Sequence, residues 1–238
     1  MRLRSAILPL ALAAAAVMPA HAASVALVLA IDVSESVSAD RYALQHDGIA
    51  SAFESPQLVK AIEALPGGIE TLVIEWSDPD KIAITVGWTR VANQPTASGF
   101  AAAVRSTHRT SNGLTAIGAA MLAAAAAFEH MPEPAAHRVI DVSGDGMANF
   151  GEPPAVARDL LVKQGITING LAILTEEPYL DDYYRHNVIG GPSSFVLVAK
   201  DMDSFAAAIK NKLVQEVANA AGTALAPAGS FDQLRRGG

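Results

Sequence analysis

The chain has 238 residues, of which 24 are acidic and 17 basic, so its formal net charge is −7. An acidic chain repels phosphate backbones, so the composition argues against nucleic acid as a partner. The chain has no cysteine, which excludes disulfides as a source of stability. With 51% hydrophobic residues it can bury a core of ordinary size in a single domain.

The first 22 residues have the three-part pattern of a secretory signal peptide. Residues 1–4 form a short basic start with two arginines, and residues 6–18 are apolar apart from a proline. Ala20 and Ala22 occupy the two positions that a signal peptidase reads. The apolar run is too short to span a bilayer core of ~30 Å. We therefore expect cleavage after Ala22, a periplasmic or secreted protein, and no transmembrane segment once the signal is removed.

The remaining chain alternates strand and helix patterns. Residues 24–31 form a continuous apolar run, which is typical of a strand buried on both faces. Ser38 has the position of an N-cap before a helical pattern that extends to Phe53. The later predicted elements are, in chain order, strands at 71–76 and 81–88, helices at 97–104 and 115–130, a strand at 137–143, a helix at 153–164, strands at 166–174 and 194–198, and a last helix capped by Asp201.

This alternation predicts the fold class. Strands joined through helices pair in parallel, so we expect an α/β domain with a doubly wound, mostly parallel sheet covered by helices on both faces. The segment at 81–88 follows a Ser-Asp-Pro-Asp turn and is the expected antiparallel hairpin strand. The predicted domain covers residues 23–217, and an Ala/Gly/Pro-rich tail at 218–238 is expected to be flexible.

Polar side chains follow the ends of several predicted elements. Asp32, Ser34 and Ser36 come directly after the first strand, Asp145 follows the strand at 137–143, and Thr115 opens a helix. Ligands of open parallel sheets bind outside the carboxyl ends of the strands, so we expect these five side chains to converge at one edge.

Two carboxylates and three hydroxyls form an all-oxygen set that suits a hard cation. Mg²⁺ prefers near-octahedral oxygen ligands at ~2.0–2.1 Å and keeps some of its water. We therefore predict a Mg²⁺ site, with Mn²⁺ and Ca²⁺ as alternatives. Taken alone, an Asp-x-Ser-x-Ser run is also ordinary turn and capping chemistry. The joint placement of the three polar clusters at element ends favours the metal site.

The same residues resemble a known site. The runs that carry the resemblance are Asp32-x-Ser34-x-Ser36, Thr115-Ala-Ile-Gly118 and Gly144-Asp145-Gly146. They resemble the metal-ion-dependent adhesion site of von Willebrand factor type A domains. Further segments resemble an uncharacterised secreted bacterial branch of that superfamily, a family of unknown function. The resemblance spans residues 24–217, and Gly144 stands where the superfamily often has threonine.

The resemblance implies a three-layer fold with about six strands and a divalent cation, usually magnesium. It implies that Ser34, Ser36 and Thr115 coordinate the cation through their hydroxyls. Asp32 and Asp145 would coordinate it directly or through water. It also implies that an Asp or Glu carboxylate of a protein partner completes the site, so the expected function is metal-dependent protein binding of the adhesion type.

Two other functions compete with this expectation. The first is a periplasmic hydrolase, such as a phosphatase that uses an aspartyl nucleophile. Such enzymes need a second Asp two residues later as the general acid, and that position is Ser34 here, so we expect no enzyme activity. The second is a small-solute-binding protein, which usually needs two lobes and a longer chain.

Two further features have structural interpretations. Asp141 lies inside a predicted strand, where a buried carboxylate needs a partner, so we expect an ion pair or a hydrogen bond there. Asp181, Asp182, Tyr183 and Tyr184 form a polar and aromatic cluster, which we expect in a solvated loop.

Overall fold

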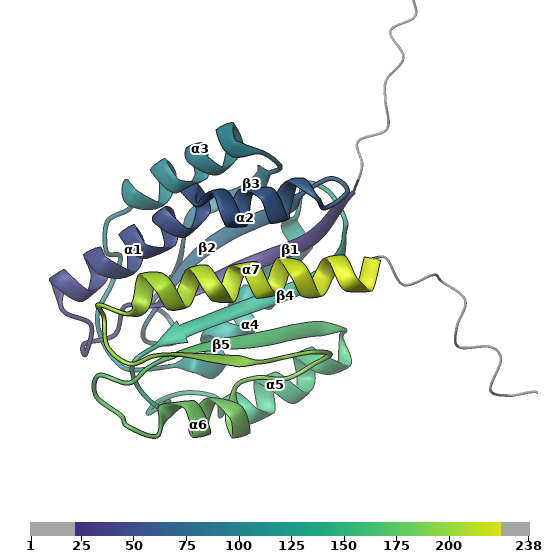
Figure 1. The fold of residues 1–238 in the computed structure, drawn as a ribbon. Coiled ribbons are helices and arrows are strands. Elements are labelled where there is room, and N and C mark those ends of the chain that lie inside the picture. The colour runs from purple at the N-terminus through teal and green to yellow at the C-terminus, as the bar shows by residue number, and fades with distance from the viewer. Residues whose placement is uncertain (1–21, 225–238) are drawn as a thin grey trace, which may run out of the picture.

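The computed structural model describes residues 22–224, which fold around one sheet of six strands (Figure 1). The strand order is β3-β2-β1-β4-β5-β6, and only the β2–β3 pair is antiparallel. The mostly parallel sheet with one antiparallel strand is therefore confirmed. The strands are β1 (Ala23–Asp32), β2 (Ile69–Trp76), β3 (Ile82–Val91), β4 (Ala135–Gly144), β5 (Ile166–Ile173) and β6 (Val196–Ala199).

Helices cover both faces of the sheet, which makes three layers. The central strand β1 shows why both faces need a cover. Leu27 and Leu29 pack into the core on one side, and Val28 and Ala30 pack into the core on the other. One layer contains α1 (Ala39–Glu54), α2 (Pro56–Glu63), α3 (Gln94–Arg105) and α7 (Phe205–Ala224). The other contains α4 (Ile117–Ala127), the short 3₁₀ helix η1 (Phe128–His130), α5 (Pro154–Lys163) and α6 (Leu180–Asn187).

The prediction of a loop at Asp181–Tyr184 is wrong, because these residues lie in helix α6. This helix is short and very polar, so its apolar stripe is narrow. The stripe consists of Leu180, Tyr184 and Val188, which are spaced four residues apart and fully buried. A spacing of four places side chains on one helix face, and this was the signal that the sequence offered. Tyr184 is thus a core residue.

The ends of the domain differ from the predicted boundaries. Helix α7 continues through Ala224, past the predicted domain end at residue 217, and Ala220 packs against the core. The predicted signal peptide lies outside the described residues apart from its last position, and so does the tail from residue 225 onward. Within residues 22–224, no helix is long and apolar enough to cross a membrane.

Strand β1 lies at the point where the chain connections of the sheet change direction. Its neighbours are β2 on one side and β4 on the other, and Ile31 pairs with both Glu75 and Ser143. The next residue, Asp32, ends β1 and therefore lies at the carboxyl ends of two neighbouring strands whose connections diverge. Open α/β sheets bind their ligands at such a switch point.

Asp141 forms the expected ion pair in the middle of β4. The ammonium of Lys212 on α7 lies 2.5 Å from Asp141 Oδ1 and 2.7 Å from Glu216 Oε1. The Asn169 amide donates to the same Glu216 oxygen at 2.8 Å. All four side chains are buried, so this cluster joins α7 to the sheet inside the core.

Candidate metal centre

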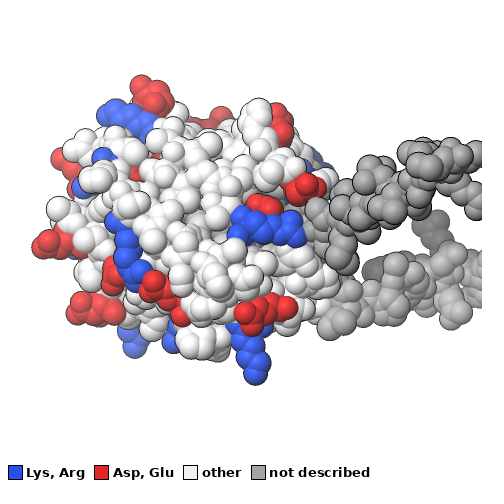
Figure 2. All heavy atoms as spheres, turned by 90° about the horizontal axis from the view of Figure 1, so that it is seen from above, with Lys and Arg blue, Asp and Glu red and all other residues white. Residues whose placement is uncertain are grey.

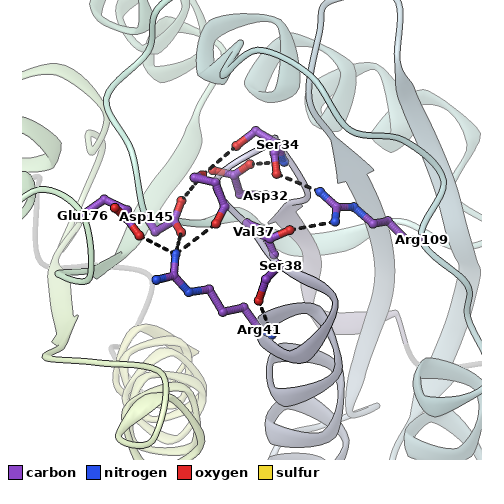
Figure 3. Close-up of polar contacts among 9 residues, drawn as sticks. Asp32, Ser34, Val37, Ser38, Arg41, Arg109, Asp145 and Glu176 are labelled. Carbon is purple, nitrogen blue, oxygen red and sulfur yellow. Dashed lines mark hydrogen bonds and ion pairs between the residues drawn. The ribbon is translucent and has the colours of Figure 1, made fainter.

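Asp32, the last residue of β1, is completely buried at the switch point. Its Oδ1 accepts a hydrogen bond from the Ser34 backbone N–H at 2.8 Å (Figure 3). Its Oδ2 is buried and has no hydrogen-bond partner. Burial raises the pKa of the Asp32 carboxyl to about 7, although hydrogen bonds from Ser34 partly oppose the shift. The site therefore contains a carboxylate whose negative charge the chain does not neutralise.

The two serines connect Asp32 to Asp145. Ser36 Oγ donates to Asp145 Oδ1 at 2.6 Å and lies 3.3 Å from Ser34 Oγ. Ser34 and Asp145 are buried, whereas Ser36 is exposed, so the group reaches from the core to the surface. The structure thus brings together four of the five side chains predicted from the sequence.

Thr115 lies in the loop before α4, because that helix begins at Ile117 and not at Thr115 as predicted. Its backbone N–H donates to Asn149 Oδ1 at 2.8 Å, and its carbonyl accepts from the Asn149 N–H at 3.1 Å. These two bonds fasten Thr115 to the loop that follows Asp145. A Cβ atom built on Gly146 would lie 3.8 Å from Thr115 Oγ1, so the fifth predicted side chain lies beside the residue that follows Asp145.

Arg41 contributes a positive charge that sequence reasoning missed. Its Nη1 lies 3.3 Å from Asp145 Oδ2, 2.9 Å from the Ser36 carbonyl oxygen and 2.6 Å from Glu176 Oε1 (Figure 3). Burial raises the pKa of the Asp145 carboxyl, while the Ser36 hydrogen bond and the Arg41 charge lower it. Arg41 is thus a cation supplied by the chain at the outer side of Asp145.

Arg109 holds the loop that carries the serines, and sequence reasoning missed it too. Its guanidinium donates to the carbonyl oxygens of Val33, Ser34 and Val37 at 2.7–2.8 Å and to that of Ser111 at 2.8 Å. These bonds satisfy backbone acceptors that would otherwise need water. They also fix the loop in one conformation.

The segment around Arg109 is itself anchored to β2. Glu75, near the end of that strand, accepts from both the backbone N–H and the hydroxyl of Thr110 at 2.8 Å. It also bonds to the Tyr42 hydroxyl and the His46 ring. These hydrogen bonds outweigh burial and lower the pKa of Glu75, which is therefore an ionised anchor next to Arg109.

The residues present fit a hard divalent cation. The buried, unpartnered Asp32 Oδ2 marks a place where positive charge would be stabilised, and Asp145 lies within reach of the same serines. Within the described residues, no group of three or more His, Cys, Asp or Glu side chains could hold a metal, so a cation here would depend on hydroxyl oxygens. Hydroxyls beside two carboxylates suit Mg²⁺ better than a soft metal. The side chains that could hold the cation are Asp32, Ser34, Ser36, Thr115 and Asp145.

Comparisons with known proteins agree with this fold. The family described as "Protein of unknown function (DUF1194)" matches residues 22–221. No curated protein matches the chain in sequence.

Three solved structures show the similarity in fold. Proximal thread matrix protein 1 from the mussel byssus, with a zinc-occupied MIDAS motif, is 16% identical with a TM-score of 0.60, covering 82% of this chain and 46% of that one. A von Willebrand factor type A protein from Catenulispora acidiphila is 19% identical with a TM-score of 0.59, covering 84% and 43%. The vWF domain of the pilus tip protein Mfa5 from Porphyromonas gingivalis is 9% identical with a TM-score of 0.56, covering 83% and 96%.

The chain thus spans less than half of the matrix protein and of the Catenulispora protein, and nearly all of the Mfa5 domain. At these identities the similarity shows the fold, and it confirms the resemblance drawn from the sequence. The chain belongs to the DUF1194 family and has the fold of von Willebrand factor type A domains.

Proposed function

We propose that this protein is an exported binding module that captures a protein partner through a divalent cation, preferably Mg²⁺. One observation carries the proposal: Asp32 Oδ2 is buried without a partner at the switch point of the sheet, beside Ser34. A cation held there would neutralise a charge that the chain leaves uncompensated. Export to the periplasm or the medium is proposed from the signal-like sequence of residues 1–22.

The number of ligands supports a role for the partner. Two carboxylates and three hydroxyls do not fill an octahedron if one aspartate acts through water, so at least one position is left for another oxygen. A carboxylate fits that position best, because it satisfies both the charge of the cation and its preference for oxygen. We therefore propose that the partner presents an Asp or Glu side chain.

The surface around the candidate centre indicates what surrounds that acidic residue. Leu114, Met147 and Phe150 are 43%, 37% and 54% exposed, and they lie in the same loops as Thr115 and Asp145. Exposed apolar side chains gathered beside a polar site are typical of partner-binding surfaces. Over the face drawn in Figure 2, by contrast, acidic and basic side chains lie next to one another without a broad patch of one sign. A partner loop with apolar residues flanking its acid would fit the loops.

Binding is proposed in preference to catalysis. An aspartyl-nucleophile phosphatase needs a general acid where this chain has Ser34, and a serine hydroxyl is too weak an acid for that role at neutral pH. The buried histidine nearest in sequence to the loop, His46, is occupied by Glu75 and by the Tyr42 carbonyl. A periplasmic hydrolase and a small-solute-binding protein remain the alternatives that the experiments must exclude.

The first test is a thermal shift with Mg²⁺ or Mn²⁺ added to chelator-treated protein. A ligand that binds only the folded state, at one hundred times its dissociation constant, adds ~2.7 kcal/mol to the free energy of unfolding. Asp32→Ala and Asp145→Ala should abolish this gain, and Glu63→Ala, at an exposed acid that ends α2 at the opposite edge of the sheet, should keep it. A wild type with neither a thermal shift nor calorimetric binding contradicts the proposal.

The second test is capture of a partner from the envelope of the parent cell. Capture should need the cation and should be lost in Asp145→Ala. Thr115→Ala should weaken capture more than it lowers stability, and Phe150→Ser should weaken capture while leaving metal binding intact. Capture that survives both chelator and Asp145→Ala would place the interaction surface elsewhere.

A further inference from the structure

The hydroxyl of Tyr184 is a buried polar group that the proposed function does not yet use. Tyr184 comes from α6 on the far side of β4, and its side chain is completely buried. Its ring packs in the core with Leu180 and Val188, but its hydroxyl has no hydrogen-bond partner. A buried hydroxyl without a partner destabilises a fold by about 1–3 kcal/mol, so its position needs an explanation.

Gly144 shows where this hydroxyl points. A Cβ atom built on Gly144 would lie 2.9 Å from Tyr184 Oη and 2.8 Å from Asp32 Oδ2. Both unpartnered oxygens therefore border the same small space beside one glycine. Any larger residue at position 144 would fill that space and separate the two groups.

The two groups are chemically complementary. A phenol hydroxyl can donate a hydrogen bond, and an ionised carboxylate can only accept. Burial, together with the nearby Asp32 and Asp145 charges, raises the pKa of Tyr184 well above its ordinary value. The phenol therefore keeps its proton at neutral pH and remains available as a donor.

We infer that Tyr184 is a positioning residue of the candidate metal centre, whose hydroxyl donates to Asp32 Oδ2 through one water once the cation is bound. This inference rests on the proposed function. The bond would fix the rotation of the Asp32 carboxylate, whose other oxygen is already held by the Ser34 N–H.

The inference also links α6 to the candidate centre. The loop before α6 carries Glu176, which bonds to Arg41 beside Asp145. Tyr184 and Glu176 therefore approach the candidate centre from one segment of the chain. Tyr184 lies beside Asp32 in the core, and Glu176 bonds at the surface to Arg41, which lies beside Asp145. A residue that orients a metal ligand in this way changes metal affinity without touching the metal.

The test compares Tyr184→Phe with the wild type by calorimetric titration of Mn²⁺ or Mg²⁺. Removal of a hydrogen bond that orients a metal ligand weakens metal binding roughly 10–100-fold, and we expect a loss in this range. The melting temperature in chelator should stay the same or rise, because the variant no longer buries an unpaired hydroxyl. The matched control is Tyr179→Phe, whose side chain is 74% exposed and whose metal affinity should not change.

Gly144→Ala tests the inference without changing Tyr184, so it serves if Tyr184→Phe folds poorly. The double variant then tests whether the two positions are coupled. Gly144→Ala should weaken metal binding in the wild type, because its methyl group would meet both oxygens. In the Tyr184→Phe background the same methyl group should have a smaller effect, since one of these oxygens is gone. Equal metal affinity in wild type and Tyr184→Phe, or strictly additive losses, would overturn the inference. A wild type that binds no metal would instead overturn the proposed function, and this inference with it.

Discussion

Two buried aspartates on neighbouring strands, Asp141 and Asp32, have the same chemistry and opposite outcomes. Burial raises the pKa of each carboxyl, to about 7 in the case of Asp32. The chain supplies a cation to Asp141, because the Lys212 ammonium lies 2.5 Å away and is itself completely buried. It supplies none to Asp32, whose Oδ2 has no partner. Asp141 is neutralised within the chain, whereas Asp32 has no countercharge from the chain and could bind a ligand.

Position along the strand explains the difference. Asp141 lies within β4, where α7 covers the sheet and brings Lys212 over it. Asp32 is the last residue of β1, at the edge of the sheet where loops and not helices surround the strand ends. A carboxylate beneath a helix must be neutralised during folding. A carboxylate at the strand end can be neutralised afterwards, when a ligand binds. A buried acid is therefore a candidate binding group mainly where the surrounding chain provides no countercharge.

The largest expected effect tests the ion pair of Asp141. Lys212→Met should lower the free energy of unfolding by roughly 3–5 kcal/mol, because it leaves Asp141 and Glu216 buried without their cation. Urea unfolding measures this loss. The matched control is Lys210→Met, at a half-exposed position on the same helix, which should change stability by less than ~0.5 kcal/mol. Equal losses in both variants would mean that the buried cluster does not stabilise the domain.

The next effect concerns Asp32 and the dependence of stability on pH. Because the pKa of Asp32 is about 7 in the folded protein and ~3.9 in an unfolded chain, the metal-free folded state holds the proton more tightly. The free energy of unfolding should therefore fall as pH rises from about 4 through 7. The raised pKa of Asp141 acts in the same direction, so the part due to Asp32 is the part missing in Asp32→Asn.

A bound cation should offset this trend. The cation needs ionised Asp32, so its affinity should rise as pH approaches 7, by up to about 1.4 kcal/mol per pH unit. The thermal shift given by Mg²⁺ should thus be larger at pH 8 than at pH 5.5. An equal shift at both pH values would show that Asp32 does not titrate with the cation.

The smallest expected effect tests the charge that the chain places at the outer edge of the open site. Arg41→Gln removes a positive charge that lies 3.3 Å from Asp145 and would repel a cation. We expect a severalfold gain in Mg²⁺ affinity, about 1 kcal/mol or less because Arg41 is partly solvated, and a larger gain at low salt. Arg185→Gln, at an exposed position on α6, is the control. A loss of affinity in Arg41→Gln would mean that Arg41 serves mainly to hold Asp145 in place.

The parts of the site that could be predicted lie within short stretches of sequence. Asp32, Ser34 and Ser36 follow a strand whose apolar run is unmistakable, and Asp145 follows another, so the sequence alone places both groups at one edge of the sheet. The parallel order of the strands came from the same alternation. Short-range pattern and general rules of α/β sheets were sufficient for these residues.

The residues that sequence reasoning missed act over long distances in the chain. Arg109 bonds to the carbonyls of Val33 and Ser34 from more than seventy residues away, and no local pattern distinguishes it from a surface arginine. Tyr184 was missed because α6 is short and polar, so its stripe of three buried residues was outweighed by its charges. Such residues are identified only when tertiary contacts are known.

The grip of Arg109 on the serine loop has a consequence for the rate at which a cation would bind. Because the guanidinium ties together carbonyls from Val33 to Val37, the loop loses its conformational freedom when the domain folds, and not when a ligand arrives. Binding to a loop that is already ordered needs no rearrangement. Association would then proceed in a single kinetic phase whose rate grows in proportion to cation concentration, without a slower step of loop closure.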